Sequence, residues 1–151
     1  PDWVLDIYGQ GMLQDELQQK IIAANAGTYI HLKGSSPDIM YEYLNCSLLV
    51  LTSRYEGFPM ALLEAMACGV PCVTYDCPFG PRSMITNMRN GILVEEGDKK
   101  EMVDKINNLI ENEKNRKKIG TNARKYVLQY SQKNIMDKWN ILFNNCLTIT
   151  S

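Results

Sequence analysis

The sequence has few of the residues from which metal sites and disulfide frameworks are built. Its single histidine, His31, lies in a strand-like run, and its five cysteines cannot all pair with one another. Cys68, Cys72 and Cys77 form the densest group, but they lack the two-residue gaps of a zinc knuckle. We interpret these cysteines as small buried apolar side chains in a reduced, cytosolic protein, and we expect no metal.

The chain also lacks a strong net charge and a long apolar run. Sixteen basic residues stand against seventeen acidic ones, and the net charge of -1 argues against nucleic acid as a partner. No run of eighteen apolar residues occurs, so we expect a soluble protein in the cytoplasm. Basic residues cluster between positions 114 and 125. We interpret them as a solvated helix face, with peripheral contact to the inner face of an anionic membrane as the open alternative.

Length and periodicity indicate one α/β domain. The 151 residues are 45% hydrophobic, which is enough for a single core, and the abrupt start at Pro1 suggests a fragment. Short apolar runs bounded by glycine and proline alternate with stretches of helical spacing. We expect strands at 3–8, 29–32, 48–51, 70–75 and 91–94, with the run at 48–51 central in its sheet. Between them we expect helices over 12–22, over 36–44 with Ser36 as its cap, and over 82–85. This alternation predicts a Rossmann-like parallel sheet with helices on both faces.

Ligands of such sheets bind at the carboxyl ends of the strands, where four loops are expected to converge. These loops are residues 9–11, Gly34, residues 53–58 and residues 76–81. A helix from Pro59 to Cys68 follows the third loop and is apolar nearly all round, which predicts burial. Glu64 is its one carboxylate, so it needs hydrogen-bond donors from ribose hydroxyls or from the protein.

The start of the same helix is a candidate anion site. Its backbone N–H groups and the positive end of its dipole favour a diphosphate, and Gly57 permits close approach. Pro59 has no N–H, so the amides of Met60 and its neighbours are the expected donors. Glu56, just before the helix, is better suited to accepting hydrogen bonds from sugar hydroxyls. The structural alternative is that Glu64 bonds within the fold and Glu56 is a solvated loop charge.

The segment from Glu56 to Pro71 resembles the signature of glycosyltransferase family 4, in which two glutamates are separated by seven residues. The resemblance extends over nearly the whole chain, through residues 6–11, 32–34, 78–81 and 90–94 and the late Tyr130 and Trp139. It implies the GT-B architecture, in which two Rossmann-like domains face across a cleft. Residues 1–151 would then be the single nucleotide-sugar-binding domain, without the N-terminal acceptor domain and without the first strand-helix unit of its own domain.

The resemblance also implies residue roles. Glu56 would be the catalytic contact to the donor sugar and Glu64 would bind ribose. The donor site would also contain Lys33 and Gly34 near the base, and the sugar-diphosphate segment Gly57, Phe58, Pro59 and Met60. Two departures matter: the basic pair of the family would lie upstream of Pro1, and Ser83 stands where many relatives carry glutamate. We interpret Arg82 as a solvated helix start and assign it no role in the site.

The implied function is transfer of a hexose-type sugar, with retention and without a metal, from a UDP-type donor to a saccharide or lipid-linked acceptor. This activity would belong to surface polysaccharide or glycolipid synthesis, and the fragment alone would be inactive. The nucleotide sugar would be a substrate, so no cofactor is expected. Two alternatives stay open, a non-catalytic nucleotide-sugar-binding or regulatory module and a GT-B epimerase. We also expect Trp139, Leu142 and Phe143 to be partly exposed, because in such proteins the final helices cross onto the N-terminal domain.

Overall fold

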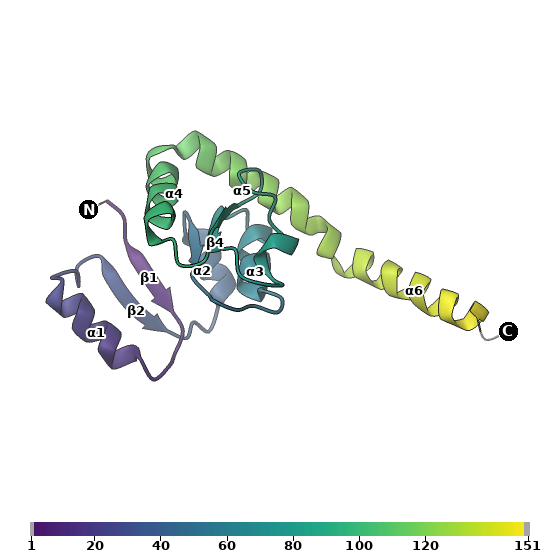
Figure 1. Cartoon of the computed structure of the whole chain (residues 1–151), viewed down its shortest axis with the longest axis horizontal. Helices are drawn as coiled ribbons and strands as arrows, with labels where there is room; N and C mark the ends of the chain where they lie inside the picture. Colours follow the sequence, from purple (N-terminus) through teal and green to yellow (C-terminus); the bar gives the residue numbers. More distant parts are fainter. Residues whose placement is uncertain (1, 150–151) are drawn as a thin grey trace. The chain divides into compact units, whose positions relative to one another are not determined.

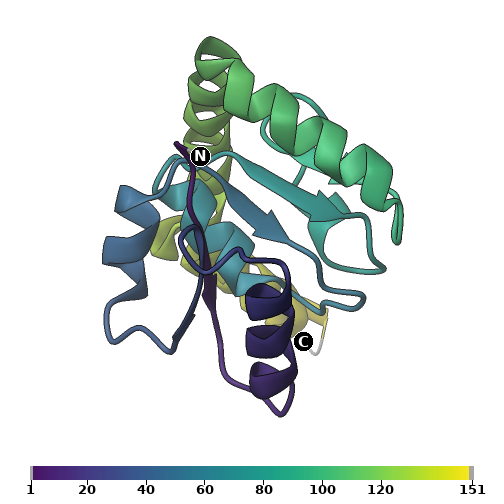
Figure 2. The ribbon, with the colours of Figure 1, turned by 90° about the vertical axis from the view of Figure 1, so that its left-hand side faces the viewer.

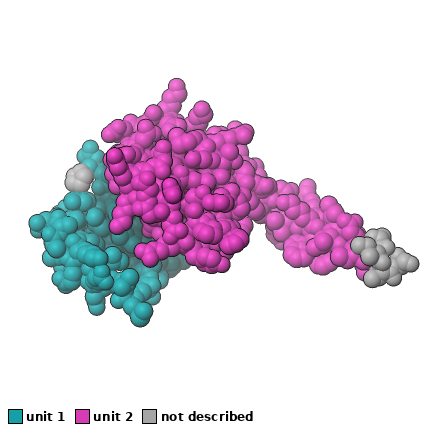
Figure 3. All heavy atoms as spheres, in the orientation of Figure 1, with its two compact units in different colours: residues 1–42 teal, residues 43–151 magenta. Residues whose placement is uncertain are grey.

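The computed structural model describes residues 2–149, of which 148 and 149 are described by their backbone alone. The chain divides into two compact units, residues 1–42 and residues 43–151 (Figure 3). The single domain expected over 1–151, and the convergence of four loops, therefore stay predictions.

Unit 1 is built on two parallel strands. Strands β1 (Leu5–Tyr8) and β2 (Ile30–Gly34) pair in parallel, and helix α1 (Gln14–Ala23) connects them. Both strands and the helix lie where the sequence predicts them, within two residues or so at the ends. The strands close with glycines in the left-handed region, since Gly9 and Gly34 have φ of 136° and 67°. Only glycine adopts that region readily, so these positions fix the turns that follow the sheet.

Helix α2 (Ile39–Asn45) begins later than predicted and has a different cap. The sequence suggests a helix starting at Ser36 and Pro37 with serine as the cap. Instead, Asp38 Oδ1 accepts a hydrogen bond from the Tyr41 amide at 3.0 Å, while Ser36 Oγ accepts one from the Asp38 amide at 3.2 Å. The prediction was wrong because Ser36 and Asp38 are both good capping residues and lie two positions apart. Asp38 is the N-cap, because its side chain reaches a free amide in the first turn of α2.

Unit 2 contains a three-stranded parallel sheet with the order β3-β4-β5. The strands are β3 (Leu49–Leu51), β4 (Cys72–Tyr75) and β5 (Ile92–Val94). The expectation that 48–51 is the central strand was wrong within this sheet. Strand β4 is central and every one of its residues is buried, whereas the residues of β3 are half-buried. An uninterrupted apolar run indicates a parallel strand, but it does not by itself say whether that strand lies at the centre or the edge.

Helices cover both faces of this sheet. Val73 and Tyr75 of β4 pack with Met102 and Leu109 of α4 (Lys99–Glu111) in the main core. Because side chains alternate along a strand, Cys72 and Thr74 face the other way, toward α3 (Met60–Ala67), which packs on β3 and β4. Figure 1 shows β4 between α4 and α3, and Figure 2 shows α4 lying against the strands. The predicted Rossmann-like layering is therefore present.

Three helical segments complete unit 2. Helix α5 (Glu113–Val127) packs against α3 and α4, and a 3-10 turn, η2 (Leu128–Tyr130), joins it to α6 (Gln132–Ile149). Helix α6 extends away from the rest of unit 2 (Figure 3). Trp139 is 49% exposed and Phe143 56%, with their rings stacked at 5.4 Å, and Leu142 is 50% exposed. The predicted partial exposure of these three side chains is confirmed.

Candidate functional site

The start of α3 presents backbone amides at the end of strand β3. Pro59 is the N-cap of α3, with φ of -74°, and its carbonyl accepts hydrogen bonds from the amides of Leu62 and Leu63 at 3.0 and 3.1 Å. The amides of Met60 and Ala61 precede these first intrahelical bonds, so helix geometry leaves them directed at the space before the helix. Together with the helix dipole, they form the kind of surface that accepts an anion.

Helix α3 is less buried than its composition predicts. Leu62, Ala65 and Met66 are buried against the sheet and α5, but Met60 is 53% exposed and Ala67 is exposed as well. The prediction of burial on all sides was wrong because the described residues cover one face of this helix only. Glu64 is accordingly half-buried.

Glu64 has a protein partner that sequence reasoning missed. Burial, the negative charge of Glu64 and a hydrogen bond to Glu64 together raise the pKa of Tyr43 to about 12. Tyr43, in the last turn of α2, is itself buried. The neutral hydroxyl therefore donates to the carboxylate, as the predicted need for donors requires. A carboxylate has about four acceptor sites, so Glu64 keeps capacity for ligand hydroxyls.

Glu56 lies where two loops of unit 2 meet. It is half-buried in the loop between β3 and α3, and Gly80 of the following loop packs against it and against Pro59. This second loop is closed by Arg82, whose Nε and Nη2 donate to the two carboxylate oxygens of Asp76 at 2.8 and 2.9 Å. The interpretation of Arg82 as a solvated helix start is confirmed, because its side chain is 62% exposed at the start of a 3-10 turn, and its guanidinium also makes this bidentate pair. The 3-10 turn η1 (Pro81–Ser83) follows, close to the helix predicted there.

Phe58 contacts an aromatic residue that lies much later in the chain. Its ring is 46% exposed and meets the ring of Tyr130 edge to face, with centroids 5.7 Å apart. Tyr130 in turn lies beside Tyr126, whose hydroxyl donates to the Ser83 carbonyl at 3.1 Å. These ring contacts and this hydrogen bond connect Phe58, Ser83 and Tyr130 near the start of α3. Pairing of such distant aromatics has no local sequence signal.

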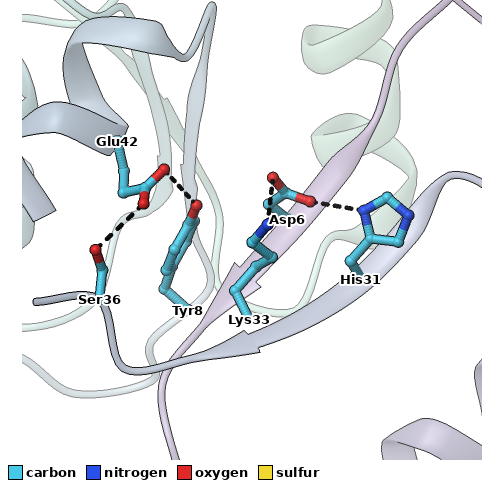
Figure 4. A network of polar contacts seen from close by, with 6 residues as sticks. All are labelled: Asp6, Tyr8, His31, Lys33, Ser36 and Glu42. Atoms are coloured by element: carbon cyan, nitrogen blue, oxygen red, sulfur yellow. Dashed lines mark hydrogen bonds and ion pairs between the residues drawn. The ribbon is translucent and has the colours of Figure 1, made fainter.

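In unit 1 the predicted base-binding residues Lys33 and Gly34 lie at the carboxyl end of β2. Lys33 Nζ is 4.0 Å from Asp6 Oδ2, and Asp6 Oδ1 is 2.9 Å from His31 Nδ1 on the neighbouring strand (Figure 4). Asp6 and His31 are opposite one another in the strand register, which explains the contact. The predicted position of Lys33 on a strand end holds, and its contact with a base stays a prediction.

A second polar group fixes the segment after β2. Glu42 accepts hydrogen bonds from the hydroxyls of Tyr8, at 2.7 Å, and Ser36, at 3.2 Å (Figure 4). These bonds tie the end of β1 and the β2-α2 connection to α2. The Gly9-Gln10-Gly11 loop borders a hollow of about 230 Å³, lined by Ile7, Tyr8, Gly9, Gln10, Gly11, Leu13, Gln14, Leu17 and Leu32. A largely apolar hollow at the end of a parallel strand is consistent with the predicted ligand edge of this unit.

The described residues contain neither a metal-ligand cluster nor a membrane-spanning helix. Over residues 2–149, no group of three or more histidine, cysteine, aspartate or glutamate side chains is placed to hold a metal. In the same range, no helix has both the length and the apolar content that crossing a membrane requires. Of the three cysteines interpreted as buried apolar residues, Cys72 and Cys77 are fully buried and Cys68 is half-buried.

The chain is similar to known glycosyltransferases. It is 34% identical over 140 residues to the poly(ribitol-phosphate) alpha-N-acetylglucosaminyltransferase of Staphylococcus aureus, covering 92% of this chain and 28% of that protein. It is 29% identical over 149 residues to the poly(glycerol-phosphate) alpha-glucosyltransferase of Bacillus subtilis, covering 99% of this chain and 22% of that protein. The chain thus spans about a quarter of the length of these relatives.

Solved structures give the same result for the fold. The crystal structure of a Staphylococcus aureus TarM mutant, in complex with fondaparinux, alpha-GlcNAc-glycerol and UDP, matches with a TM-score of 0.87 and 33% identity. That match covers 93% of this chain and 29% of TarM. Anabaena HepE in complex with UDP matches with a TM-score of 0.78 and 28% identity, over 85% of this chain and 37% of HepE.

These matches support the Rossmann-like α/β fold of GT-B glycosyltransferase domains, as the sequence predicts. Residues 1–126 match the family described as Glycosyl transferases group 1. That stretch contains the Glu56 loop, all of α3 and most of α5. The chain therefore belongs to the group 1 glycosyl transferases.

Proposed function

We propose that the chain is the nucleotide-sugar-binding domain of a family 4 glycosyltransferase. The complete enzyme transfers a hexose-type sugar, with retention, from a UDP-linked donor to a saccharide or lipid-linked acceptor. The reaction needs no metal and no cofactor, and it takes place in the cytoplasm, with peripheral contact at the inner face of the membrane. It contributes to surface polysaccharide or glycolipid synthesis.

The observation that carries this proposal is the arrangement of α3. The helix begins with amides free for an anion, at Met60 and Ala61, and it has a half-buried carboxylate on each side of that start, Glu56 before it and Glu64 one turn into it. A nucleotide sugar offers complementary groups in the same order. Its diphosphate suits the amides, and the hydroxyls of its sugar and ribose suit the two carboxylates.

Each residue of the proposed donor site then has its own role in binding. Gly57 lets the diphosphate approach the backbone, and the amides of Met60 and Ala61 together with the helix dipole stabilise the departing nucleoside diphosphate. Glu56 accepts hydrogen bonds from the donor sugar, and Phe58 and Pro59 shape the wall beside it. Glu64 binds ribose and is held in place by the Tyr43 hydroxyl. Lys33 and Gly34 contact the base.

Related proteins support the choice of donor and acceptor classes. TarM and HepE were solved with UDP, and HepE also with UDP-glucose. The names of the relatives describe transfer of N-acetylglucosamine or glucose to poly(ribitol-phosphate) or poly(glycerol-phosphate). A UDP-hexose donor and a cell-surface polymer acceptor are therefore the first compounds to test on this protein.

Calorimetry with UDP, GDP and UDP-glucose on the complete gene product is the test. We expect UDP to bind, and Glu64→Ala to weaken UDP by about ten-fold or more, because ribose loses a charge-assisted acceptor. The matched control is Glu111→Ala, which removes an exposed carboxylate at the end of α4 and is expected to leave the affinity unchanged. Absence of binding to any nucleotide by the wild-type protein would overturn the proposal.

A further inference from the structure

Gly80 leaves no room for a side chain next to Glu56. A Cβ atom built on Gly80 would lie 2.8 Å from Glu56 Cβ, 3.2 Å from Pro59 Cδ and 3.3 Å from the Glu56 carbonyl oxygen. Separations below 3.0 Å between carbon atoms require something to move. Here the nearest atom is a Cβ, close to the backbone, and not the end of a flexible side chain. Because φ of Gly80 is -108°, glycine is required at this position for space and not for a left-handed backbone.

The loop that carries Gly80 is fixed at both ends. The Arg82 guanidinium bridges back to Asp76, and Ser83 Oγ donates to the Gly80 carbonyl at 2.6 Å. The Ser83 carbonyl in turn accepts from the Tyr126 hydroxyl. Cys77, Pro81 and Met84 anchor the loop in the core, because all three are fully buried. The loop is therefore held by contacts on both sides of Gly80, whereas Glu56 is only half-buried, so a side chain added at Gly80 is expected to displace the Glu56 side chain.

Phe79 supports this interpretation. It has φ of 68°, a left-handed conformation that is unfavourable for a residue with a Cβ, and its ring is 77% exposed. An exposed ring gains little from burial, so packing of the phenylalanine itself does not explain the conformation. This conformation turns the backbone at the residue directly before Gly80, where the loop approaches Glu56 and Pro59.

We infer that Gly80 is a positioning residue for Glu56. Because Gly80 has no side chain, the Glu56 segment can approach this loop closely, and this approach sets the position of the Glu56 carboxylate relative to the start of α3. The inference deepens the proposed function and rests on it. It makes a specific claim about the ligand. Gly80 matters for the sugar part of the donor, which Glu56 contacts, and not for the nucleoside diphosphate, which the amides of α3 contact.

The experiment compares four forms of the complete gene product, the wild type, Gly80→Ala, Glu56→Gly and the double variant. Calorimetry gives the affinity of each for UDP and for the UDP-sugar that the wild type binds best among UDP-glucose, UDP-galactose and UDP-N-acetylglucosamine. The thermal unfolding midpoints of the same proteins, measured without ligand, report the contact between residue 80 and residue 56. Gly27→Ala is the matched control, because a Cβ on Gly27 would meet nothing within 4 Å.

We expect Gly80→Ala to weaken the UDP-sugar by about ten-fold and UDP by less than about two-fold. In the Glu56→Gly background, which lacks the nearest clashing atom, the same change should cost no further affinity. The unfolding midpoint should fall in Gly80→Ala and recover in part in the double variant. Gly27→Ala should change neither affinity.

Several results would overturn the inference. Equal weakening of UDP and UDP-sugar by Gly80→Ala, or an equal loss in both Glu56 backgrounds, would mean that Gly80 acts independently of Glu56, while the proposed function would stand. Unchanged affinities in Gly80→Ala would have the same meaning. If the wild type binds neither compound, the proposed function fails and this inference fails with it.

Discussion

At the scale of single residues, Tyr43 and Glu64 illustrate what the sequence can and cannot predict. The position of a lone carboxylate on an apolar helix correctly indicates that Glu64 needs hydrogen-bond donors. The identity of the donor could not be predicted, because Tyr43 lies on another helix and its own spacing is that of an ordinary core residue. The same holds for Gly80, whose contact with Glu56 depends on how two loops meet after the sheet has formed.

The Tyr43 pKa leads to a prediction about pH. Its pKa in the folded protein is raised to about 12 from an ordinary 10, so the unfolded chain loses the proton first. The stability that comes from the protonated hydroxyl is complete below pH 10 and is lost as pH rises from 10 through 12. Thermal melts from pH 8 to 12 should therefore show the difference between wild type and Tyr43→Phe shrinking over this window.

Tyr55→Phe is the control for that experiment. It removes a hydroxyl from a ring that is 71% exposed, and its unfolding midpoint should track the wild type at every pH. If the Tyr43→Phe difference stays constant between pH 10 and 12, the hydroxyl of Tyr43 is not held in its protonated form by Glu64 and burial.

At the scale of elements, periodicity predicted the kinds of helices and strands, because apolar spacing reports which side of a segment is buried. It did not predict neighbours. The run at 48–51 forms an edge strand of its sheet, and α3 is covered on one face only, since both properties depend on which segments pack next to them. The sequence also did not decide which residue caps a helix, since Asp38 and not Ser36 is the N-cap of α2.

The packing of α5 on α3 depends on two glycines. A Cβ on Gly120 would meet the carbonyl of Gly69, which ends α3 with φ of 77°. Gly120→Ala should therefore destabilise the protein by about 1–3 kcal/mol or more through overpacking, although alanine in a helix is otherwise favourable. Urea unfolding is the measurement. Thr121→Ala, at the exposed neighbouring position, should stay within about 0.5 kcal/mol of wild type, and a similar small effect of Gly120→Ala would contradict the close approach.

Arg116 connects α5 to the end of α4. Its Nη1 donates to the carbonyls of Leu109 and Ile110 at 2.6 and 3.1 Å, where a helix leaves its last carbonyls without partners. Arg116→Ala should cost about 1–3 kcal/mol of stability in urea unfolding, because charge-assisted bonds to a helix end are lost. Lys118→Ala is the exposed control on the same helix, and equal effects of the two changes would argue against the cap.

At the scale of the whole molecule, α6 carries exposed apolar side chains with no cover among the described residues of unit 2. They include Met136, Trp139, Ile141, Leu142 and Phe143. The family resemblance predicts that this stripe lies on the N-terminal domain of a GT-B enzyme. Residues 1–151 expressed alone should then self-associate through α6, and Phe143→Glu should reduce that association in sedimentation velocity runs.

In the complete gene product we expect the same substitution to affect stability instead of self-association. If its N-terminal domain covers α6, Phe143→Glu should lower the unfolding midpoint of the complete protein, because a charge enters an apolar interface. Lys138→Glu changes an exposed position of the same helix and is the control. A complete protein that is indifferent to Phe143→Glu would show that α6 is not covered in this way.

We propose that the start of α3 and the two glutamates beside it bind a nucleotide sugar. A crystal structure of the complete gene product with UDP bound tests it most directly. We expect diphosphate oxygens within hydrogen-bond distance of the Met60 and Ala61 amides. We also expect ribose hydroxyls to bind Glu64 while Tyr43 keeps its own hydrogen bond to that carboxylate. UDP bound elsewhere, with Glu64 contacting Tyr43 alone, would contradict it.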